Sequence, residues 1–438
     1  MSFKKIIFPF FFLMLCFGAH SQDFSALVSK AWEHNQQLKA REFQLESANH
    51  LFKEAKSMYG PTVGFGVQYT LAAGGRSIQL PVGDLLNPVY ATLNTITQSN
   101  QFPTIENANE QFLPNNFYDA RFRVSQPIYY PDLAINKKLK KQSTEQKSLE
   151  IRAFRRLIAK EVMNAYFFLE SAKRAAEIYR ANDTLLLEAQ RVTQSMIKNG
   201  IALPSALARI ETQQSVLFSS TLEAEGNIQN ALSYYQFITG ESESQNLNLP
   251  ELPDSESGNT TIREEILQIE NGQSMLHLAI QKEESFYLPR IGAQLDLGSQ
   301  DFNFGFQPYV LFGLNAEINL FDNKRHQHRK SSYQVELNAL ENQKLYISDQ
   351  FELQKTMAKQ NLETAILQAK TFETRVGAVK KLYFEIFKKY KEGSANYLEL
   401  LDAQTQITQI QIQYNLARQN AWLKWSDYVY SSASFPVF

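Results

Sequence analysis

The sequence contains 438 residues, 44% of them hydrophobic, and its 44 Lys and Arg residues nearly balance its 45 Asp and Glu residues. A chain with so little net charge lacks the basic excess with which nucleic-acid-binding proteins attract phosphate, so that function class is excluded. Its one cysteine, Cys16, lies in an N-terminal segment that we expect to be removed, which excludes disulfide bonds from the mature chain.

The first residues have the pattern of a secretory signal peptide. Two lysines precede an apolar run over residues 6–17, and Ala19 and Ser21 place small residues at the two positions that a signal peptidase reads. We therefore expect residues 1–21 to be a signal peptide that is cleaved after Ser21.

Two other membrane attachments are less well supported. Lipidation of Cys16 is an alternative, but the bulky Leu15 stands where a lipoprotein signal has a small residue. Beyond the signal, the sequence has no apolar run of about 18 residues or more, the minimum for a transmembrane helix. A membrane role would therefore have to use strands.

The first half of the mature chain, residues 22–240, passes from helical to strand patterns and back. Between residues 62 and 71, large apolar residues alternate with glycines and polar residues, over a length that crosses a bilayer core when the strand is tilted. The predicted elements are a helix over residues 24–58, strands over about residues 62–71 and 118–128, a long helix over about residues 132–198 and a helix over residues 205–239.

Between the two strands lies an excursion over residues 72–116 that is rich in Gly, Pro, Asn, Thr and Gln. It is too long for a hairpin turn, and we expect some local structure around Leu85 to Ile96. The sequence assigns it no role.

A polar linker, residues 241–261, separates the first half from a second, residues 262–431, and a short tail follows at residues 432–438. The second half again passes from helix to strands to helices. Its predicted elements are a helix over residues 262–286, strands over about residues 290–298 and 309–321, a long helix over about residues 323–391 and a final helix that includes residues 400–421.

The long helix of the second half has a coiled-coil seam. Its apolar residues recur at alternating intervals of three and four, as in Leu362, Ala365, Ala369 and Phe372. A helix of roughly 65 residues extends about 100 Å at 1.5 Å per residue, so it cannot belong to a compact globule.

The two halves repeat one design at a lag of about 190 residues, and together they provide four strands of membrane-crossing length. Four strands cannot close a barrel, because the smallest membrane barrels have about eight, and an open edge in lipid leaves backbone groups unpaired. If the strands enter a membrane, the protein must oligomerise.

Several stretches, in their order, spacing and duplication, resemble the TolC-like outer-membrane efflux proteins. They are INLFDN at residues 318–323, YKEG at residues 390–393 and LLDAQ at residues 400–404, together with the helix that ends before Pro61. The resemblance covers nearly the whole mature chain. It implies a mainly α fold with membrane β structure: a trimer with a 12-stranded β-barrel, four strands per chain, and a long coiled-coil α-barrel.

The same resemblance implies a function. It predicts a passive, non-enzymatic exit duct of a tripartite efflux pump or type I secretion system, located in the outer membrane of a Gram-negative bacterium and extending into the periplasm. The implied partners are two further copies of the chain, a periplasmic adaptor protein, an inner-membrane transporter and outer-membrane lipid, with no nucleic acid and no cofactor. The exported substrate stays open.

The resemblance also implies a periplasmic gate near two glycine turns, Gly200 and Gly393. The gate residues it predicts are Glu399 and Asp402, whose carboxylates from three subunits would ring the pore, with Tyr390 and Ser205 among the contacts of the closed state. The alternative is that the two acids only stabilise a helix N-terminus through the macrodipole. The sequence departs from the family pattern where Ala206 replaces an acid and Ala395 replaces an arginine, which leaves the closing salt bridges in doubt.

Aromatic and basic residues follow the second strand of each half. We expect them to lie at the membrane interface, the aromatic rings in a girdle and the basic groups near lipid phosphates. A solvated helix start is the alternative. The candidates are Tyr129, Tyr130, Lys137 and Lys138 in the first half, and Phe321, Lys324 and Arg325 in the second.

Other chemistry has weaker support. His326 and His328 suggest a metal site, but four basic residues surround them and no acid is expected beside them, so we predict none. The P-loop, nucleophile-elbow and HExxH motifs are missing, which disfavours a periplasmic enzyme. A non-pore, periplasm-spanning coiled-coil protein or adhesin is the main alternative, but such a protein has no use for four amphipathic strands.

Overall fold

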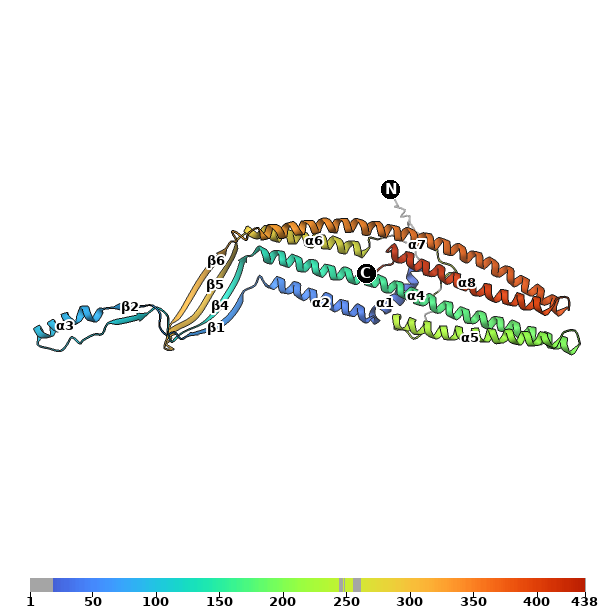
Figure 1. Cartoon of the computed structure of the whole chain (residues 1–438), viewed down its shortest axis with the longest axis horizontal. Coiled ribbons are helices and arrows are strands. Elements are labelled where there is room, and N and C mark those ends of the chain that lie inside the picture. The colour runs from blue at the N-terminus through green and yellow to red at the C-terminus, as the bar shows by residue number, and fades with distance from the viewer. Residues whose placement is uncertain (1–18, 244–246, 248, 255–260, 438) are drawn as a thin grey trace, which may run out of the picture. The chain divides into compact units, whose positions relative to one another are not determined.

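The computed structural model describes residues 19–243, 247, 249–254 and 261–437 (Figure 1). Residues 1–18 of the predicted signal peptide and part of the predicted linker lie outside these ranges. The described chain forms two compact units. A sheet unit contains residues 50–141 and 277–334, and a helical unit contains residues 19–49, 142–243, 261–276 and 335–437 together with linker residues 247 and 249–254.

Four antiparallel strands form the sheet in the order β1-β4-β5-β6. The second and third strands come from different halves of the sequence, so one sheet joins both halves. Phe65, Phe122, Leu297 and Val310 lie opposite one another along one row. The strand bounds are β1 Thr62–Thr70, β4 Phe117–Tyr129, β5 Arg290–Phe302 and β6 Pro308–Glu317.

The bounds of the last two strands differ from the prediction. β5 runs on to Phe302, because its polar residues after Leu297 still pair with β4. β6 ends at Glu317, so the predicted continuation over residues 318–321 is wrong. Glu317 lies opposite Arg290, the first residue of β5, and Pro289 directly precedes Arg290. Beyond that pair the alternating sequence meets no neighbouring strand.

Residues 72–116 form a small folded insertion of two short strands, β2 Ser77–Leu80 and β3 Ala108–Gln111, and a helix, α3 Val82–Thr97. Polar side chains attach the helix to the segment that follows it. Asn87 donates to the Ile105 carbonyl at 2.9 Å and accepts from the Ile105 amide, and Asn94 makes the same pair of bonds with Phe102. The apolar residues lie on the outside, where Leu85 and Ile96 are 68% and 73% exposed.

The insertion and the helices leave opposite ends of the sheet. The insertion follows the end of β1 and precedes β4, whereas helices precede β1 and β5 and follow β4 and β6. The helix bounds are α1 Ala19–His34, α2 Gln36–Ser57, α4 Pro131–Lys198, α5 Pro204–Thr239, α6 Glu264–Glu284, α7 Arg325–Lys391 and α8 Tyr397–Ser431, with a 3₁₀ turn at Ser285–Tyr287.

The core of the helical unit contains large aromatic residues from α1, α4 and α8. Phe24 is fully buried and meets Tyr166 and Phe167 edge-on at ring-centroid distances of 5.6 Å. Phe167 in turn stacks on Trp422 at 5.0 Å. Among the described residues, no helix is both long enough and apolar enough to cross a membrane.

Candidate functional site: a two-faced sheet and two glycine turns

The two faces of the sheet have opposite chemistry. One face is apolar and exposed over all four strands, with Phe65, Phe122 and Phe312 exposed by 62%, 54% and 68%. Because side chains alternate along a strand, the other face carries the glycines and polar residues in between. The first face suits hydrocarbon and the second suits water.

The polar face carries a network of ion pairs. Arg123 binds Asp296 at two points, Nε to Oδ1 and Nη2 to Oδ2, both at 2.8 Å, and Gln294 donates to the same carboxylate at 2.8 Å. Farther along the same face, Asp119 accepts from the Arg121 guanidinium at 2.9 Å and from the Tyr309 hydroxyl at 2.9 Å. Sequence analysis did not assign this network. Its signal is the charges at alternate positions in β4, Asp119, Arg121 and Arg123, together with Asp296 in β5.

The glycine turns have the geometry that their residue type requires. Gly200 and Gly393 have φ of 73° and 75°, in the left-handed region that favours glycine. In both turns, the amide after the glycine donates back to a carbonyl five residues earlier, Ile201 to Met196 and Ser394 to Lys389, each at 2.9 Å. These are Schellman motifs, which end α4 and α7 in the same way.

Glu399 takes part in the N-terminal cap of α8. The Asn396 side chain accepts from the amides of Leu398 and Glu399, and its own NH₂ group donates to Glu399 Oε1 at 2.9 Å. Within one chain Glu399 therefore has the helix-stabilising role of the alternative interpretation. Asp402 is exposed and accepts from Gln406 at 2.8 Å. The gate assignment of both residues stays a prediction.

The other predicted gate residues lie in different environments. The side chain of Tyr390 is buried, and its hydroxyl lies 2.6 Å from Thr193 Oγ1, so it joins α7 to α4 within the chain. Ser205 is exposed at the start of α5. Ala206 is 1% exposed and Ala395 packs beside the Tyr390 cluster, so in this chain both positions contribute to packing.

The predicted interface residues lie at the helix end of the sheet, and their contact with lipid stays a prediction. Phe321 and Tyr129 are exposed by 81% and 45%, whereas Tyr130 is half-buried. The Lys137 ammonium lies 5.9 Å from the centroid of the Tyr59 ring. Lys138, Lys324 and Arg325 are exposed.

The expectation that no acid lies beside the histidine pair is wrong. His326 Nδ1 is 2.8 Å from Asp322 Oδ1, four residues earlier, and its ring stacks on Phe286 at 4.2 Å. Two of the basic neighbours are also paired, Arg329 with Glu283 at 2.7 Å and Lys330 with Glu284 at 2.8 Å. Within the described ranges no group of three potential metal ligands gathers.

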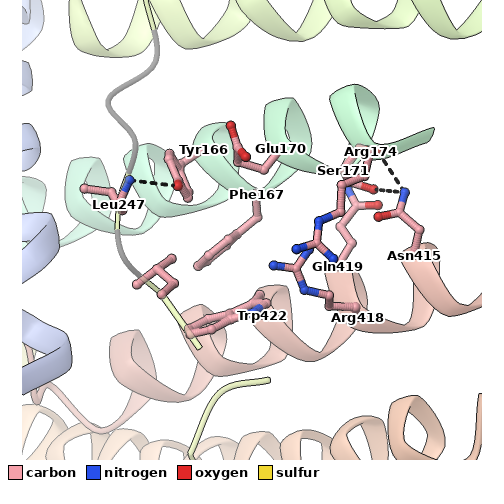
Figure 2. A pocket seen from close by; sticks show the side chains of 11 residues that line it. Tyr166, Phe167, Glu170, Ser171, Arg174, Leu247, Asn415, Arg418, Gln419 and Trp422 are labelled. Atoms are coloured by element: carbon pink, nitrogen blue, oxygen red, sulfur yellow. Dashed lines mark hydrogen bonds between the residues drawn. The ribbon is translucent and has the colours of Figure 1, made fainter. Parts of the chain in front are cut away.

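The helical unit contains a small polar cavity of about 260 Å³ between α4 and α8, lined by residues including Tyr166, Arg174 and Arg418 (Figure 2). Glu251 satisfies both arginines: it binds Arg174 at 2.8 and 3.2 Å, and its carbonyl accepts from Arg418 at 2.8 Å. Burial raises the pKa of Tyr166 to about 12. Because Glu251 already binds both arginines of the cavity, the cavity suits a structural role.

Neither a protein-family model nor a curated protein sequence matches the chain. Solved structures do match it. CusC, described as a transmembrane channel, matches with a TM-score of 0.72 and 12% identity over 94% of this chain and 92% of CusC. The outer-membrane protein VceC of Vibrio cholerae matches at 0.70 and 13% over 95% and 97% of the two chains.

A third match is the open state of MtrE, an outer-membrane channel of Neisseria gonorrhoeae, with a TM-score of 0.70 and 13% identity over 94% of this chain and 89% of MtrE. All three share its fold over nearly their whole length. These matches confirm, at the level of the fold, the resemblance to TolC-like proteins. The fold of this chain is that of the outer-membrane channels.

Proposed function

We propose that the protein is a passive outer-membrane channel, the exit duct of a tripartite efflux pump or type I secretion system. The observation that carries the proposal is the two-faced sheet, whose apolar face is exposed on all four strands. A soluble protein rarely exposes so much contiguous apolar surface. Facing lipid, that surface has a natural environment, and the polar face then lines an aqueous pore.

The sheet also supports a trimer. Within the described chain, β1 and β6 each pair on one side only, so each leaves a row of backbone donors and acceptors at a sheet edge. In a membrane these groups need partners, since an unpaired group in hydrocarbon costs several kcal/mol. Three copies joined β6 to β1 form a closed 12-stranded barrel and satisfy both edges.

The helices support the same assembly. Residues on α7, including Val335, Leu345, Leu353 and Leu367, are between 59% and 68% exposed. Such a row is unfavourable in water and is buried when neighbouring copies pack side by side. In the trimer these helices form the wall of an α-helical tunnel in the periplasm.

The glycine turns are where the proposed duct meets its partners and closes. Ile201, Leu203 and Leu398 are 65%, 70% and 49% exposed beside the turns, which suits docking of a periplasmic adaptor protein. That adaptor would connect the duct to an inner-membrane transporter, which supplies the energy. Glu399 and Asp402, from three copies, form the acidic rings of the gate.

At the helix end of the sheet, we propose that three aromatic residues lie at the periplasmic interface of the outer membrane: Tyr129, Tyr130 and Phe321. The basic side chains of Lys137, Lys138, Lys324 and Arg325 then lie near lipid phosphates. The exposure of Phe321 and Tyr129 supports this assignment. The location is then the outer membrane of a Gram-negative bacterium.

Single-channel conductance of the detergent-extracted protein in a planar bilayer tests both the pore and the gate. The variant for the gate is Glu399→Gln/Asp402→Asn, because the side-chain carbonyl of a glutamine can still accept the bond from the Asn396 side chain while the charge is removed. We expect discrete openings from wild type, and larger or less cation-selective openings from the variant.

Other results would separate the parts of the proposal. Openings that the variant leaves unchanged would keep the channel and remove the gate assignment. A stable, membrane-inserted oligomer without conductance in either form would favour the non-pore structural protein.

A further inference from the structure

We propose that Arg121 and Arg123 form a basic belt on the inner wall of the sheet pore, which attracts anionic groups of the solutes that pass. The inference rests on the proposed function, because it requires the polar face to line a pore. It assigns the sheet end a charge opposite to that of the acidic pair, Glu399 and Asp402.

The burial of the four charged side chains carries the inference. The Asp296 side chain is 3% exposed and its partner Arg123 is 41% exposed; the Asp119 side chain is 14% exposed and Arg121 is 34% exposed. In both pairs the carboxylate lies beneath the guanidinium. The formal charges cancel, but a solute on this face approaches the cations first.

Hydrogen bonds hold the carboxylates in that position. Asp296 accepts three bonds, two from Arg123 and one from Gln294. Asp119 accepts from Arg121 and Tyr309. Because these donors already occupy the carboxylate oxygens, the acids are poor partners for a cation in the pore.

The neighbouring positions leave the guanidiniums uncovered. Gly64 and Gly66 of β1 lie opposite Arg123 and Arg121, and a Cβ added at either glycine would meet open space. On the β5 side, Gly298 lies opposite Arg121, and a Cβ there would come within 2.8 Å of the Arg121 Cβ. A larger residue at Gly298 would therefore displace the arginine.

The chemistry of the belt identifies the class of ligand. A guanidinium presents five N–H donors in a planar fork that matches carboxylate, phosphate and sulfate groups. The bond pair to Asp296 uses Nε and Nη2 of Arg123, and no hydrogen bond involves its Nη1 in the part of the chain that the structure describes. Three copies would place six such groups around one pore.

The test is block of single-channel current by inorganic pyrophosphate, added to each side of the bilayer in turn. The main variant is Arg121→Gln/Asp119→Asn/Arg123→Gln/Asp296→Asn, which removes both pairs and leaves the formal net charge unchanged. We expect its half-blocking concentration to rise at least about tenfold, the usual effect of losing one charge-assisted contact. If only the net charge of the pore determined the block, the half-blocking concentration would not change in this variant.

Two controls accompany this variant. Arg121→Lys/Arg123→Lys keeps the positive charge and should keep the block to within about threefold, weakened only by the loss of the planar fork. Arg180→Gln/Glu225→Gln removes an exposed ion pair between α4 and α5, 2.6 Å apart, and should leave the block unchanged.

Each outcome bears on one claim. Wild-type openings whose pyrophosphate block survives in the main variant would overturn the belt and leave the channel standing. Absence of wild-type conductance would overturn both. If the main variant does not insert, Arg121→Gln/Asp119→Asn gives the same test, because it leaves the more deeply buried Asp296 pair intact.

Discussion

Arg156 binds Glu264 at two points, Nε to Oε2 at 3.0 Å and Nη2 to Oε1 at 2.7 Å, and both residues are almost fully buried. Its remaining Nη1 group donates to the Phe435 carbonyl at 3.0 Å. One side chain of α4 thereby fixes the start of α6 and the C-terminal segment.

Breaking this pair on one side should destabilise the helical unit strongly. Glu264→Gln leaves a buried guanidinium without its counter-ion, which costs about 3–5 kcal/mol. We expect Arg156→Met/Glu264→Leu to cost less than the single change, since it leaves no buried charge. Thermal unfolding in detergent checks the order. An equal loss of stability in the single and double variants would contradict the expected order. As a control, Arg180→Ala breaks an exposed ion pair and should cost at most about 1 kcal/mol.

The same pair predicts acid sensitivity. Burial, the largest single effect, raises the pKa of Glu264, but the hydrogen bonds and positive charge of Arg156, with smaller contributions from a backbone hydrogen bond and Arg152, together outweigh it and hold the pKa below its usual value. A depressed folded-state pKa gives stability that is present above the ordinary glutamate pKa, about 4.3, and lost as pH falls through the folded value. We therefore expect melting temperature to fall below about pH 4 in wild type, and more gently in Glu264→Gln. An equally steep fall of the melting temperature with pH in wild type and in Glu264→Gln would contradict this prediction.

The Tyr390 and Thr193 hydroxyls predict an asymmetry. Thr193 already donates to the Ala189 carbonyl at 2.8 Å, so the Tyr390 hydroxyl is the donor of the bond between them. Tyr390→Phe leaves no buried group unsatisfied and should cost about 1 kcal/mol, whereas Thr193→Val strands the phenol and should cost about 1–3 kcal/mol. Thermal unfolding of both variants measures the difference, and the reverse order would show that the phenol finds another partner.

The cap of α8 predicts a local effect. Asn396→Ala removes the acceptor of two amides and should cost about 1 kcal/mol, with faster hydrogen exchange in the first turn of α8. Asn396→Ser keeps a capping acceptor without adding a charge beside Glu399 and serves as the control. Slow exchange at the Leu398 and Glu399 amides in the alanine variant would mean that the turn is held by other contacts.

In the insertion, polar substitutions should matter more than apolar ones. Asn87→Ala breaks the side-chain bonds to the Ile105 backbone and should loosen α3. Leu85→Ser changes a side chain that is already 68% exposed and should have little effect in the isolated subunit. Hydrogen exchange over residues 82–107 compares the two. Stronger loosening by Leu85→Ser would show that its apolar face is covered.

The sequence predicts the helices well because their signal is local and long. A seam repeated over tens of residues determines where α4 and α7 run, and Gly200 and Gly393 mark their ends. The ends of strands are harder to predict from sequence, because pairing with a neighbouring strand decides them. The local sequence around Glu317 does not show that β5 begins opposite this residue.

The polar network escaped prediction for a related reason. Arg123 and Asp296 are 173 residues apart, and only the register between β4 and β5 brings them together. The face that carries them is visible in the alternation of each strand, but the partner of each charge is not.

The β4–β5 pairing also constrains the order in which the protein is made. Both turns at the helix ends join neighbouring segments and can form as the chain emerges, whereas the central strand pair must wait for the second half. Until β5 arrives, β4 has an open edge and an apolar face in water, a form prone to aggregate. We therefore expect periplasmic holding factors to act on the first half until β5 has been made.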